Sequence, residues 1–478
     1  MSLPEVEETE DFGEFVCRKT DSIFSAIEKC LDNGLGSVLV VDDGEVLVGR
    51  ISLEDIRRAI LSGGLLQSSS LERHLEVGQP LAGGQQTDFM ADNEVLRATV
   101  NHSGQLTGVS VDRSRQAIQV SKPDLSHLEF RAVLDAFISS WISSKGPYID
   151  KFEREFGDFV GTKYAVSVTN GTVALHLALV ALGIGPGDEV IVPDLTFAAT
   201  INAVLYCGAT PVIVDVDRDT WCMTLQTMAS ACTSRTKAVI PVHLYGRPAE
   251  MMPIVSFARA RGIAVVEDCA EAPGAYYRDK MVGQFGDVSC FSFYANKIVA
   301  TGEGGMCLTN STSLARSLRQ LRDHGMASGG SYWHERVGYN YRLTNLQAAI
   351  GHSQLGRIDR TIRRNRQIEA LYHQALRDIP GVRLPAAMAA EYRSVVWLAC
   401  VQVPAEQRDQ IIETARHARI EMRPFFHPLS VLPPYEKYRR FNPNSAALSA
   451  TGINLPTSRD VDGQAIGRVA GVFRSVLA

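Results

Sequence analysis

The chain has 478 residues, of which 45% are apolar and 21% charged, a composition typical of proteins with a large buried core. The net charge of -5 provides no basic surface for nucleic acid, and no run of about 18 apolar residues predicts a membrane helix. The acidic N-terminus lacks a secretory signal pattern, and the nine cysteines include no CxxC pair that would indicate a zinc site. These features favour a cytoplasmic protein of two or three domains with reduced thiols.

Residues 1–115 are predicted to form a small α/β module: a helix, two strands joined by an Asp-Gly turn, and a second helix. Ser52 precedes the second helix and Asp55 follows three residues later, which is a capping-box pattern. Gly49, Ser52 and Asp55 also match the Gly-x-x-Ser/Thr-x-x-Asp signature of CBS (cystathionine-β-synthase) domains, which this segment resembles. The resemblance implies an adenine nucleotide or nucleotide-sugar effector at Ser52 and Asp55; helix capping alone is the alternative.

CBS modules normally occur in pairs, and residues 74–115 are predicted to be a second, degenerate copy. Residues 116–128 are predicted to be a linker and the start of a catalytic region. Beyond them, helices alternate with strands that are apolar at nearly every position, which predicts a largely parallel sheet covered on both faces. We expect this α/β sheet to form a large domain over residues 129–360, followed by a smaller α/β domain over residues 361–478.

Ligands of such sheets bind at the carboxyl ends of the strands. Gly171 and Thr172 open a helix after one strand, where backbone N–H groups and the helix dipole favour a phosphate. Phe197 follows the next strand and either stacks on a flat ring or belongs to the core. Asp268 ends a further apolar strand, where a buried carboxylate needs a partner. A protonated ring nitrogen and a helix N-terminus are the two alternatives for that partner.

Lys297 lies between an alternating apolar strand and the glycine-rich turn at residues 301–305. An amine held there can condense with an aldehyde, the chemistry that pyridoxal phosphate (PLP) enzymes require. Ser292 is placed to hold a phosphate, and Glu271 either reaches a phenolic oxygen or completes a capping box after Asp268. A solvated turn lysine is the alternative for Lys297 alone, and the order of the signals favours a PLP site.

Residues 118 to about 460 resemble the DegT/DnrJ/EryC1/StrS family of sugar aminotransferases, which are fold-type I PLP enzymes. The order and spacing of the matching stretches agree with the family. These stretches include Thr169-Asn-Gly-Thr-Val-Ala-Leu-His176, Pro193-Asp-Leu-Thr-Phe197, Glu267-Asp-Cys-Ala-Glu271, Phe291-Ser-Phe-Tyr-Ala-Asn-Lys297 and Gly338-Tyr-Asn-Tyr-Arg-Leu-Thr-Asn345.

The resemblance implies a role for each matching residue and a homodimer, or a dimer of dimers, with shared active sites. The assigned residues are Lys297 for the covalent link to PLP, Asp268 for the ring nitrogen, Glu271 for the phenolic oxygen, Phe197 for stacking on the ring, Gly171, Thr172 and Ser292 for the phosphate, and Asn340 for the phosphate of the neighbouring subunit.

The resemblance also implies transfer of an amino group from glutamate to a nucleotide-linked keto-sugar. The segment around Arg423 and His427 is most similar to the branch that aminates a GDP-linked 4-keto-6-deoxymannose, so these residues either contact substrate or shape the small domain. Ser430 stands where many members have histidine, which leaves dTDP- or UDP-linked and 3-keto sugars open. A nucleotide-responsive regulator with a vestigial PLP site is a further alternative, which the intact Lys297 and Asp268 disfavour.

Overall fold

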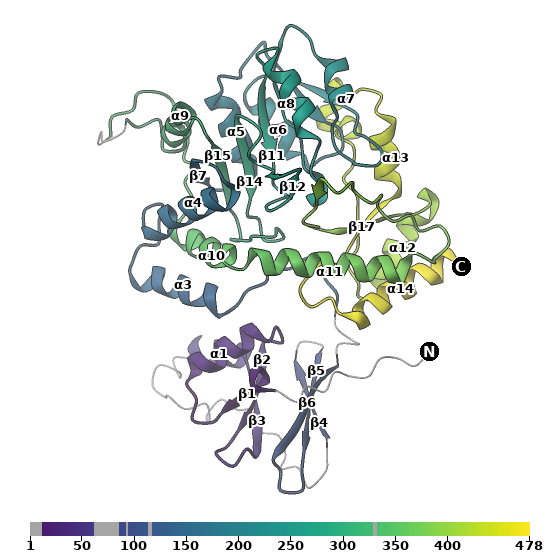
Figure 1. Cartoon of the computed structure of the whole chain (residues 1–478). Coiled ribbons are helices and arrows are strands. Elements are labelled where there is room, and N and C mark those ends of the chain that lie inside the picture. The colour runs from purple at the N-terminus through teal and green to yellow at the C-terminus, as the bar shows by residue number, and fades with distance from the viewer. Residues whose placement is uncertain (1–11, 62–85, 92–93, 113–116, 328–331) are drawn as a thin grey trace. The chain divides into compact units, whose positions relative to one another are not determined.

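The structure is a computed structural model that describes residues 12–61, 86–91, 94–112, 117–327 and 332–478 (Figure 1). The chain forms two compact units with separate hydrophobic cores. The first unit comprises residues 1–118 and 124–131, and the second comprises residues 119–123 and 132–478. The domain boundaries expected at residues 115, 128 and 360 stay predictions.

The first unit begins with the predicted strand–hairpin–helix module, which the structure confirms. β1 and β2 pair in parallel and β2 pairs with β3 in antiparallel orientation, while apolar residues of both helices pack on the sheet. Ser22 caps the first helix by accepting a hydrogen bond from the N–H of Ser25. The elements are β1 (Val16–Arg18), α1 (Ile23–Asp32), β2 (Ser37–Val41), β3 (Leu47–Ser52) and α2 (Leu53–Leu61).

A second sheet in this unit is antiparallel throughout. It consists of β4 (Gln86–Ala91), β5 (Glu94–Val100) and β6 (Leu106–Asp112). Its apolar face shares a core with Leu39 and Val41 of β2. The predicted second CBS copy, residues 74–115, includes the three strands of this sheet. Residues 74–85, 92–93 and 113–115 lie outside the described residues, so the copy stays a prediction.

A seven-stranded sheet forms the centre of the second unit (Figure 1). The strands from β14 to β9 are parallel, whereas β15 runs antiparallel to both of its neighbours. This arrangement confirms the predicted, largely parallel sheet. In spatial order the strands are β7 (Tyr164–Val168), β15 (Gly305–Thr309), β14 (Val288–Ser292), β11 (Ala264–Asp268), β10 (Thr236–Val239), β8 (Glu189–Pro193) and β9 (Thr210–Val214).

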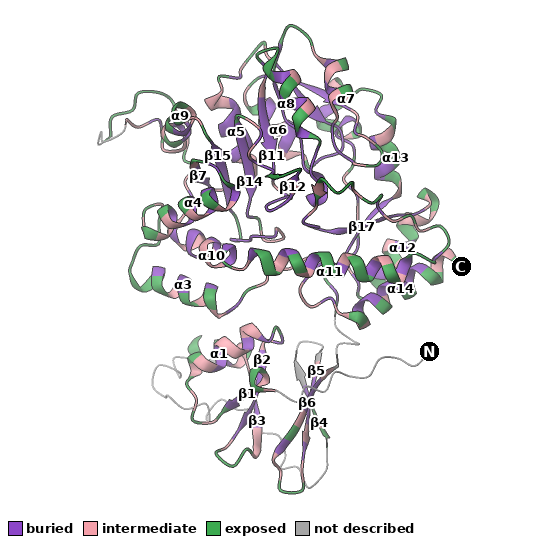
Figure 2. Cartoon of the chain, viewed as in Figure 1, coloured by how far each residue is buried: buried purple, intermediate pink, exposed green. Residues whose placement is uncertain are grey.

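Helices cover both faces of this sheet, and Figure 2 shows that the strands between them are buried. The residues of β14 are buried on both faces, so the alternating pattern expected before Lys297 is wrong. One core contains residues of α5 (Gly171–Ala181), α6 (Ala199–Tyr206) and α9 (Thr312–Arg322). The other contains residues of α4 (Pro147–Val160), α7 (Leu225–Ala231), α8 (Met251–Arg259) and α10 (Asn345–Leu355).

The C-terminal part of the second unit surrounds a small antiparallel sheet. Its strands are β17 (Ala399–Gln402), β19 (Gly452–Leu455) and β18 (Arg423–Pro424). The helices of this part are α11 (Ile358–Leu376), α12 (Ala405–His417), α13 (Pro443–Thr451) and α14 (Gly463–Leu477). A separate hairpin, β12 (Tyr276–Tyr277) and β13 (Lys280–Met281), pairs with β16 (Tyr392–Arg393), and α3 (His127–Ile138) precedes α4. Across the described part of the chain, no helix combines the length and apolarity needed to cross a bilayer.

Candidate active site

A cavity of about 680 Å³ lies at the carboxyl ends of β8, β11 and β14. Seven of the eight residues that the sequence assigns to PLP line this cavity, and Asn340 does not. Arg423, one of the two substrate candidates, lines it as well. The seven cofactor candidates in the cavity are Gly171, Thr172, Phe197, Asp268, Glu271, Ser292 and Lys297.

Lys297 is nearly buried, with 11% of its side chain exposed. Its Nζ lies 3.5 Å from Oε1 of Glu271 and 3.6 Å from the centre of the Trp397 ring. Burial lowers the pKa of this amine, against the opposing charges of Glu271 and Asp268. A larger fraction of neutral amine favours attack on a carbonyl, so a solvated turn lysine does not describe Lys297.

Asp268 ends β11 with its carboxylate buried. Oδ2 accepts a hydrogen bond from the Thr200 hydroxyl at 2.9 Å, and Oδ1 accepts one from the N–H of Ala270 at 3.2 Å. Burial raises the pKa of this carboxyl, while the bonds from Ala270 and Thr200 and the charge of Lys297 oppose the rise. Residues 269–275 form turns, so Asp268 caps no helix and retains acceptor capacity for a cationic ring nitrogen.

Glu271 is held by the main chain of a strained residue. Its Oε2 accepts the N–H of Tyr245 at 2.7 Å, and Tyr245 has a backbone φ of 53°, which residues other than glycine rarely adopt. Burial raises the pKa of Glu271, and the charge of Lys297 is the largest opposing influence. The alternative that Glu271 completes a capping box is wrong, because no helix begins at Asp268.

Three small residues, Gly171, Ser292 and Gly305, form a cradle at the N-terminus of α5. Asn170 caps this helix by accepting the N–H of Val173 at 3.0 Å. A Cβ on Gly171 would lie 2.8 Å from Cβ of Ser292, and one on Gly305 would lie 2.5 Å from the carbonyl oxygen of Asn170. Only glycine fits at these two positions. The cradle therefore leaves the helix N–H groups open to an anion.

The structure places two of the remaining candidates, Asn340 and His427, outside the cavity lining. Asn340 is exposed, and its Oδ1 accepts hydrogen bonds from Arg342. His427 is exposed and does not line the cavity, whereas Arg423 lines it and pairs with Glu421 at 2.6 Å. Ser430 is buried, and its hydroxyl donates to Asp194 at 2.8 Å.

Trp397 and Tyr245 are site residues that the sequence did not identify. The indole of Trp397 lies against Lys297 and donates from Nε1 to the carbonyl of Asn296 at 2.7 Å. The Trp397 and Tyr245 rings stack with centres 6.1 Å apart, and the Tyr245 hydroxyl accepts the N–H of Phe426. A tryptophan within the apolar run at residues 395–398 is indistinguishable from a core residue by sequence pattern.

Behind Asp268, Glu267 and His243 form a fully buried polar pair. Nδ1 of His243 accepts the N–H of Ala249 at 3.0 Å, so Nε2 carries the proton and donates to Oε2 of Glu267 at 3.3 Å. Cys269 lies close enough for the three residues to be candidate metal ligands. Both ring nitrogens are already used within the protein, so the arrangement is that of a structural network.

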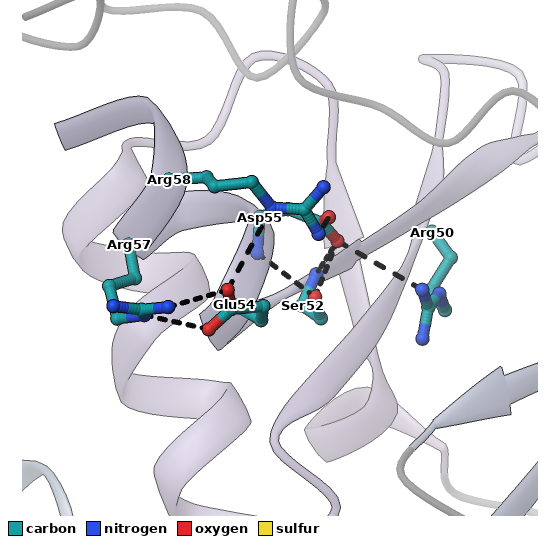
Figure 3. Close-up of polar contacts among 6 residues, drawn as sticks. All are labelled: Arg50, Ser52, Glu54, Asp55, Arg57 and Arg58. Atoms are coloured by element: carbon teal, nitrogen blue, oxygen red, sulfur yellow. Dashed lines mark hydrogen bonds and ion pairs between the residues drawn. The ribbon is translucent and has the colours of Figure 1, made fainter. Parts of the chain in front are cut away.

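In the first unit, Ser52 and Asp55 form the predicted capping box (Figure 3). The N–H of Asp55 donates to Oγ of Ser52, and both the N–H and the hydroxyl of Ser52 donate to Oδ2 of Asp55. Arg50 and Arg58 approach the same carboxylate. A cavity of about 390 Å³ in this unit is lined by other residues, including Arg18 and Lys29. Capping is thus what the geometry shows, and nucleotide binding at Ser52 and Asp55 stays a prediction.

Comparison with known proteins adds two family matches. Residues 123–474 match the DegT/DnrJ/EryC1/StrS aminotransferase family, and residues 13–62 match the CBS domain. GDP-perosamine synthase of Caulobacter vibrioides is 44% identical over 364 residues, covering 75% of this chain and 98% of the relative. GDP-perosamine synthase of Escherichia coli O157:H7 is 44% identical over 342 residues, covering 71% and 93%.

Solved structures agree with the fold. The PLP-form of Spr1654 from Streptococcus pneumoniae superposes with a TM-score of 0.70 at 28% identity, covering 74% of this chain and 97% of that one. The residues of the present cavity fit PLP, because a buried amine, a buried carboxylate with spare acceptor capacity and a glycine-lined helix N-terminus match its aldehyde, ring nitrogen and phosphate. The chain belongs to the DegT/DnrJ/EryC1/StrS family of PLP-dependent aminotransferases and carries a CBS domain at its N-terminus.

Proposed function

We propose that this enzyme transfers an amino group from glutamate to a GDP-linked 4-keto-6-deoxy sugar. The observation that carries the proposal is the convergence of Lys297, Asp268 and the Gly171 cradle in one cavity of about 680 Å³. The 44% identity to GDP-perosamine synthases supports the choice of GDP and of a 4-keto sugar. A 3-keto nucleotide sugar is the alternative substrate.

PLP, when bound, supplies the aldehyde that receives the amino group and a ring that accepts electrons. We assign Lys297 to the aldehyde and to the proton transfers, because its buried amine is biased toward the neutral form that a general base needs. Asp268 would keep a proton on the ring nitrogen, and Thr200 and Ala270 hold its carboxylate in place. Glu271 would orient the phenolic oxygen from its bond with the Tyr245 N–H.

Aromatic side chains are proposed to keep water from the reacting atoms. Phe197 lines the cavity and is 59% exposed, so a ring bound against it would cover its side chain. On the protein side, the ring centre of Phe197 lies 5.8 Å from that of Phe426. The Trp397 ring covers the Lys297 amine, with its centre 3.6 Å from Nζ. We assign Arg423 to an anionic group of the substrate because it lines the cavity, whereas His427 does not.

Product analysis by mass tests the proposal directly. The purified enzyme is incubated with PLP, glutamate and, in separate reactions, GDP-, dTDP- and UDP-linked 4-keto-6-deoxy sugars and a 3-keto sugar. We expect amination of the GDP-linked sugar, its loss in Lys297→Ala, and retention in Lys280→Ala, an exposed lysine on β13. Lack of amination of every sugar by PLP-loaded protein would exclude the function, and amination of another sugar alone would correct the substrate.

We further propose a homodimer in which Asn340 serves the partner's site. Asn340 is exposed outside the cavity of its own chain. An apolar surface on and after α3 supports association, since large side chains seldom cluster in water without a partner. Its members are Phe137 (66% exposed), Ile138 (72%), Trp141 (51%) and Ile142 (47%).

Mixed dimers test the shared site. Lys297→Ala and Asn340→Ala homodimers should both be impaired, whereas a mixed dimer contains one site with Lys297 from one chain and Asn340 from the other. Mixing the two variants in the denatured state and refolding them together should therefore restore activity. Activity that never exceeds the sum of the two homodimers, although mixed dimers form, would exclude sharing.

For the CBS domain we propose binding of an adenine nucleotide or of the nucleotide-sugar substrate as an effector, supported by the family match at residues 13–62. Titration of the full chain and of Asp55→Asn with ATP, AMP and GDP tests this, and binding that is absent or unchanged in the variant would leave the motif a helix cap. We also propose a cytoplasmic location, which the nine free cysteines support.

A further inference from the structure

Another cavity, of about 360 Å³, lies beside α11 and shares no lining residue with the active-site cavity. Its volume is within the range of small-molecule sites, which begins at about 300 Å³. The walls combine the apolar side chains of Met388 and Val396 with the ring of Tyr392. The remainder of the lining includes three arginines and His373.

Three arginines, Arg247, Arg366 and Arg393, line this cavity with one carboxylate, Glu369. The formal charges leave a surplus of two positive charges, and among the described residues no carboxylate forms an ion pair with any of the three arginines. Burial and the charge of Arg393 lower the pKa of Arg366, and the opposing charge of Glu369 offsets this effect only in part. An anion between the two arginines would offset it further.

Two buried nitrogen atoms at the cavity lack partners. Arg247 is only 7% exposed; its Nη2 donates to the carbonyls of Asp219 and Ala386, but its Nε has no hydrogen-bond partner. Nε2 of His373 is also buried without a partner. Buried polar atoms are nearly always satisfied, so a cluster of unsatisfied ones beside excess charge points to a ligand.

We propose that this cavity binds a compact dianion, either a phosphate monoester or a dicarboxylate, between Arg247, Arg366 and Arg393. A dianion matches the surplus of two positive charges, and guanidinium groups bind phosphate and carboxylate oxygens through paired N–H bonds. Arg247 is the preorganised member, because its guanidinium is fixed 4.6 Å above the Trp221 ring. Arg366 and Arg393 are exposed and admit the ligand from solvent.

The position of this cavity gives it a route to the active site. Arg247 lies two residues after Tyr245 in the sequence, and Val396 directly precedes Trp397. The main chains of these segments are joined, since the N–H of Trp397 donates to the carbonyl of Tyr245 at 3.2 Å. A bound dianion would therefore rigidify the segment that positions the Trp397 ring on Lys297.

Calorimetric titration of the holoenzyme tests the site without any substrate, so its outcome is independent of the proposed function. The probes are inorganic phosphate and, separately, succinate, at constant low ionic strength. The variant is Arg366→Gln with Arg393→Gln, and the matched control is Arg360→Gln with Arg363→Gln, two exposed arginines of α11 outside the cavity.

We expect at least one probe to bind, with a Kd at least tenfold higher in the cavity variant and within twofold of wild type in the control. The probe that shows this loss identifies the ligand as phosphate or dicarboxylate. Arg393→Gln alone is the second variant, because Arg366 also donates to the carbonyl of Ser394 and its loss can affect folding. Binding that is absent for both probes, or equal in the cavity and control variants, would overturn the proposal.

Discussion

Replacing Glu267 with glutamine tests the buried network behind Asp268. Oε1 of Glu267 accepts the N–H groups of Phe285 and Gly286, both at 2.7 Å. Oε2 accepts the N–H of Gly283 at 2.8 Å and Nε2–H of His243 at 3.3 Å. The carboxylate is fully buried and accepts four hydrogen bonds, so it fixes the loop before β14 to β11.

Glutamine supplies one acceptor oxygen and one NH₂ group, so it cannot replace this carboxylate. If its oxygen takes the place of Oε1, its NH₂ faces the N–H of Gly283 and the Nε2–H of His243. Each buried donor left without an acceptor costs about 1–3 kcal/mol, which gives about 2–6 kcal/mol for Glu267→Gln. An unfolding entropy of about 2.1 cal/mol/K per residue over about 350 residues converts this cost to a Tm lower by about 3–8 °C.

Calorimetric melting of the holoenzyme measures the change. Glu406→Gln is the matched control, because this exposed residue of α12 should shift Tm by less than about 1 °C. A Glu267→Gln variant that melts within 1 °C of wild type would show that the carboxylate is not needed by these donors, and the reasoning would be refuted.

Three further predictions concern the cavity itself. Gly305→Ala places a Cβ 2.5 Å from the backbone oxygen of Asn170 and should weaken PLP binding at least about tenfold, a loss of about 1.4 kcal/mol. The control Gly467→Ala, where a Cβ would meet open space, should leave PLP binding unchanged. Equal PLP titrations of the two variants would contradict this prediction. Trp397→Phe removes the hydrogen bond from Nε1, worth about 0.5–1.5 kcal/mol, and should increase the Kd for PLP about two- to thirteenfold by absorbance titration; an unchanged Kd would show that the indole N–H does not hold the site. Burial lowers the pKa of Lys297, so the rate of PLP association with apoenzyme should rise with pH and level off below 10.5, and a profile centred on the ordinary value of 10.5 would refute the shift.

Sequence reasoning located most of the cavity because parallel strands bring their carboxyl ends to one edge of a sheet. Phe197 and Asp268 each follow an apolar strand, so their convergence depended only on recognising those strands. Trp397 is different: it lies 100 residues after Lys297 in the chain, and its contact depends on how the C-terminal part folds back. The positive φ of Tyr245 was also unpredictable, because no glycine marks that position.

The antiparallel orientation of β15 has a local cause. Successive parallel strands need a crossover, usually through a helix. The connection between β14 and β15, residues 293–304, consists of turns and carries Lys297, so β15 returns beside β14 in the opposite direction. The reversal was readable from the absence of a helical pattern in this segment, although the apolar strands alone indicated a parallel sheet.

This reversal also builds the phosphate cradle from the register of the sheet. Ser292 pairs directly with Gly305, and Gly305 pairs on its other side with Val168, the last residue before the turn into α5. The pairing therefore sets Ser292 against the N-terminus of α5, where the missing side chains of Gly171 and Gly305 leave room. Since strand side chains alternate between faces, a slip of one residue would place Phe291 or Phe293 where Ser292 stands and fill the cradle. The two glycines and the serine are thus constrained together by one hydrogen-bonding register, which is why a short, spaced pattern of small residues was sufficient to indicate this part of the site.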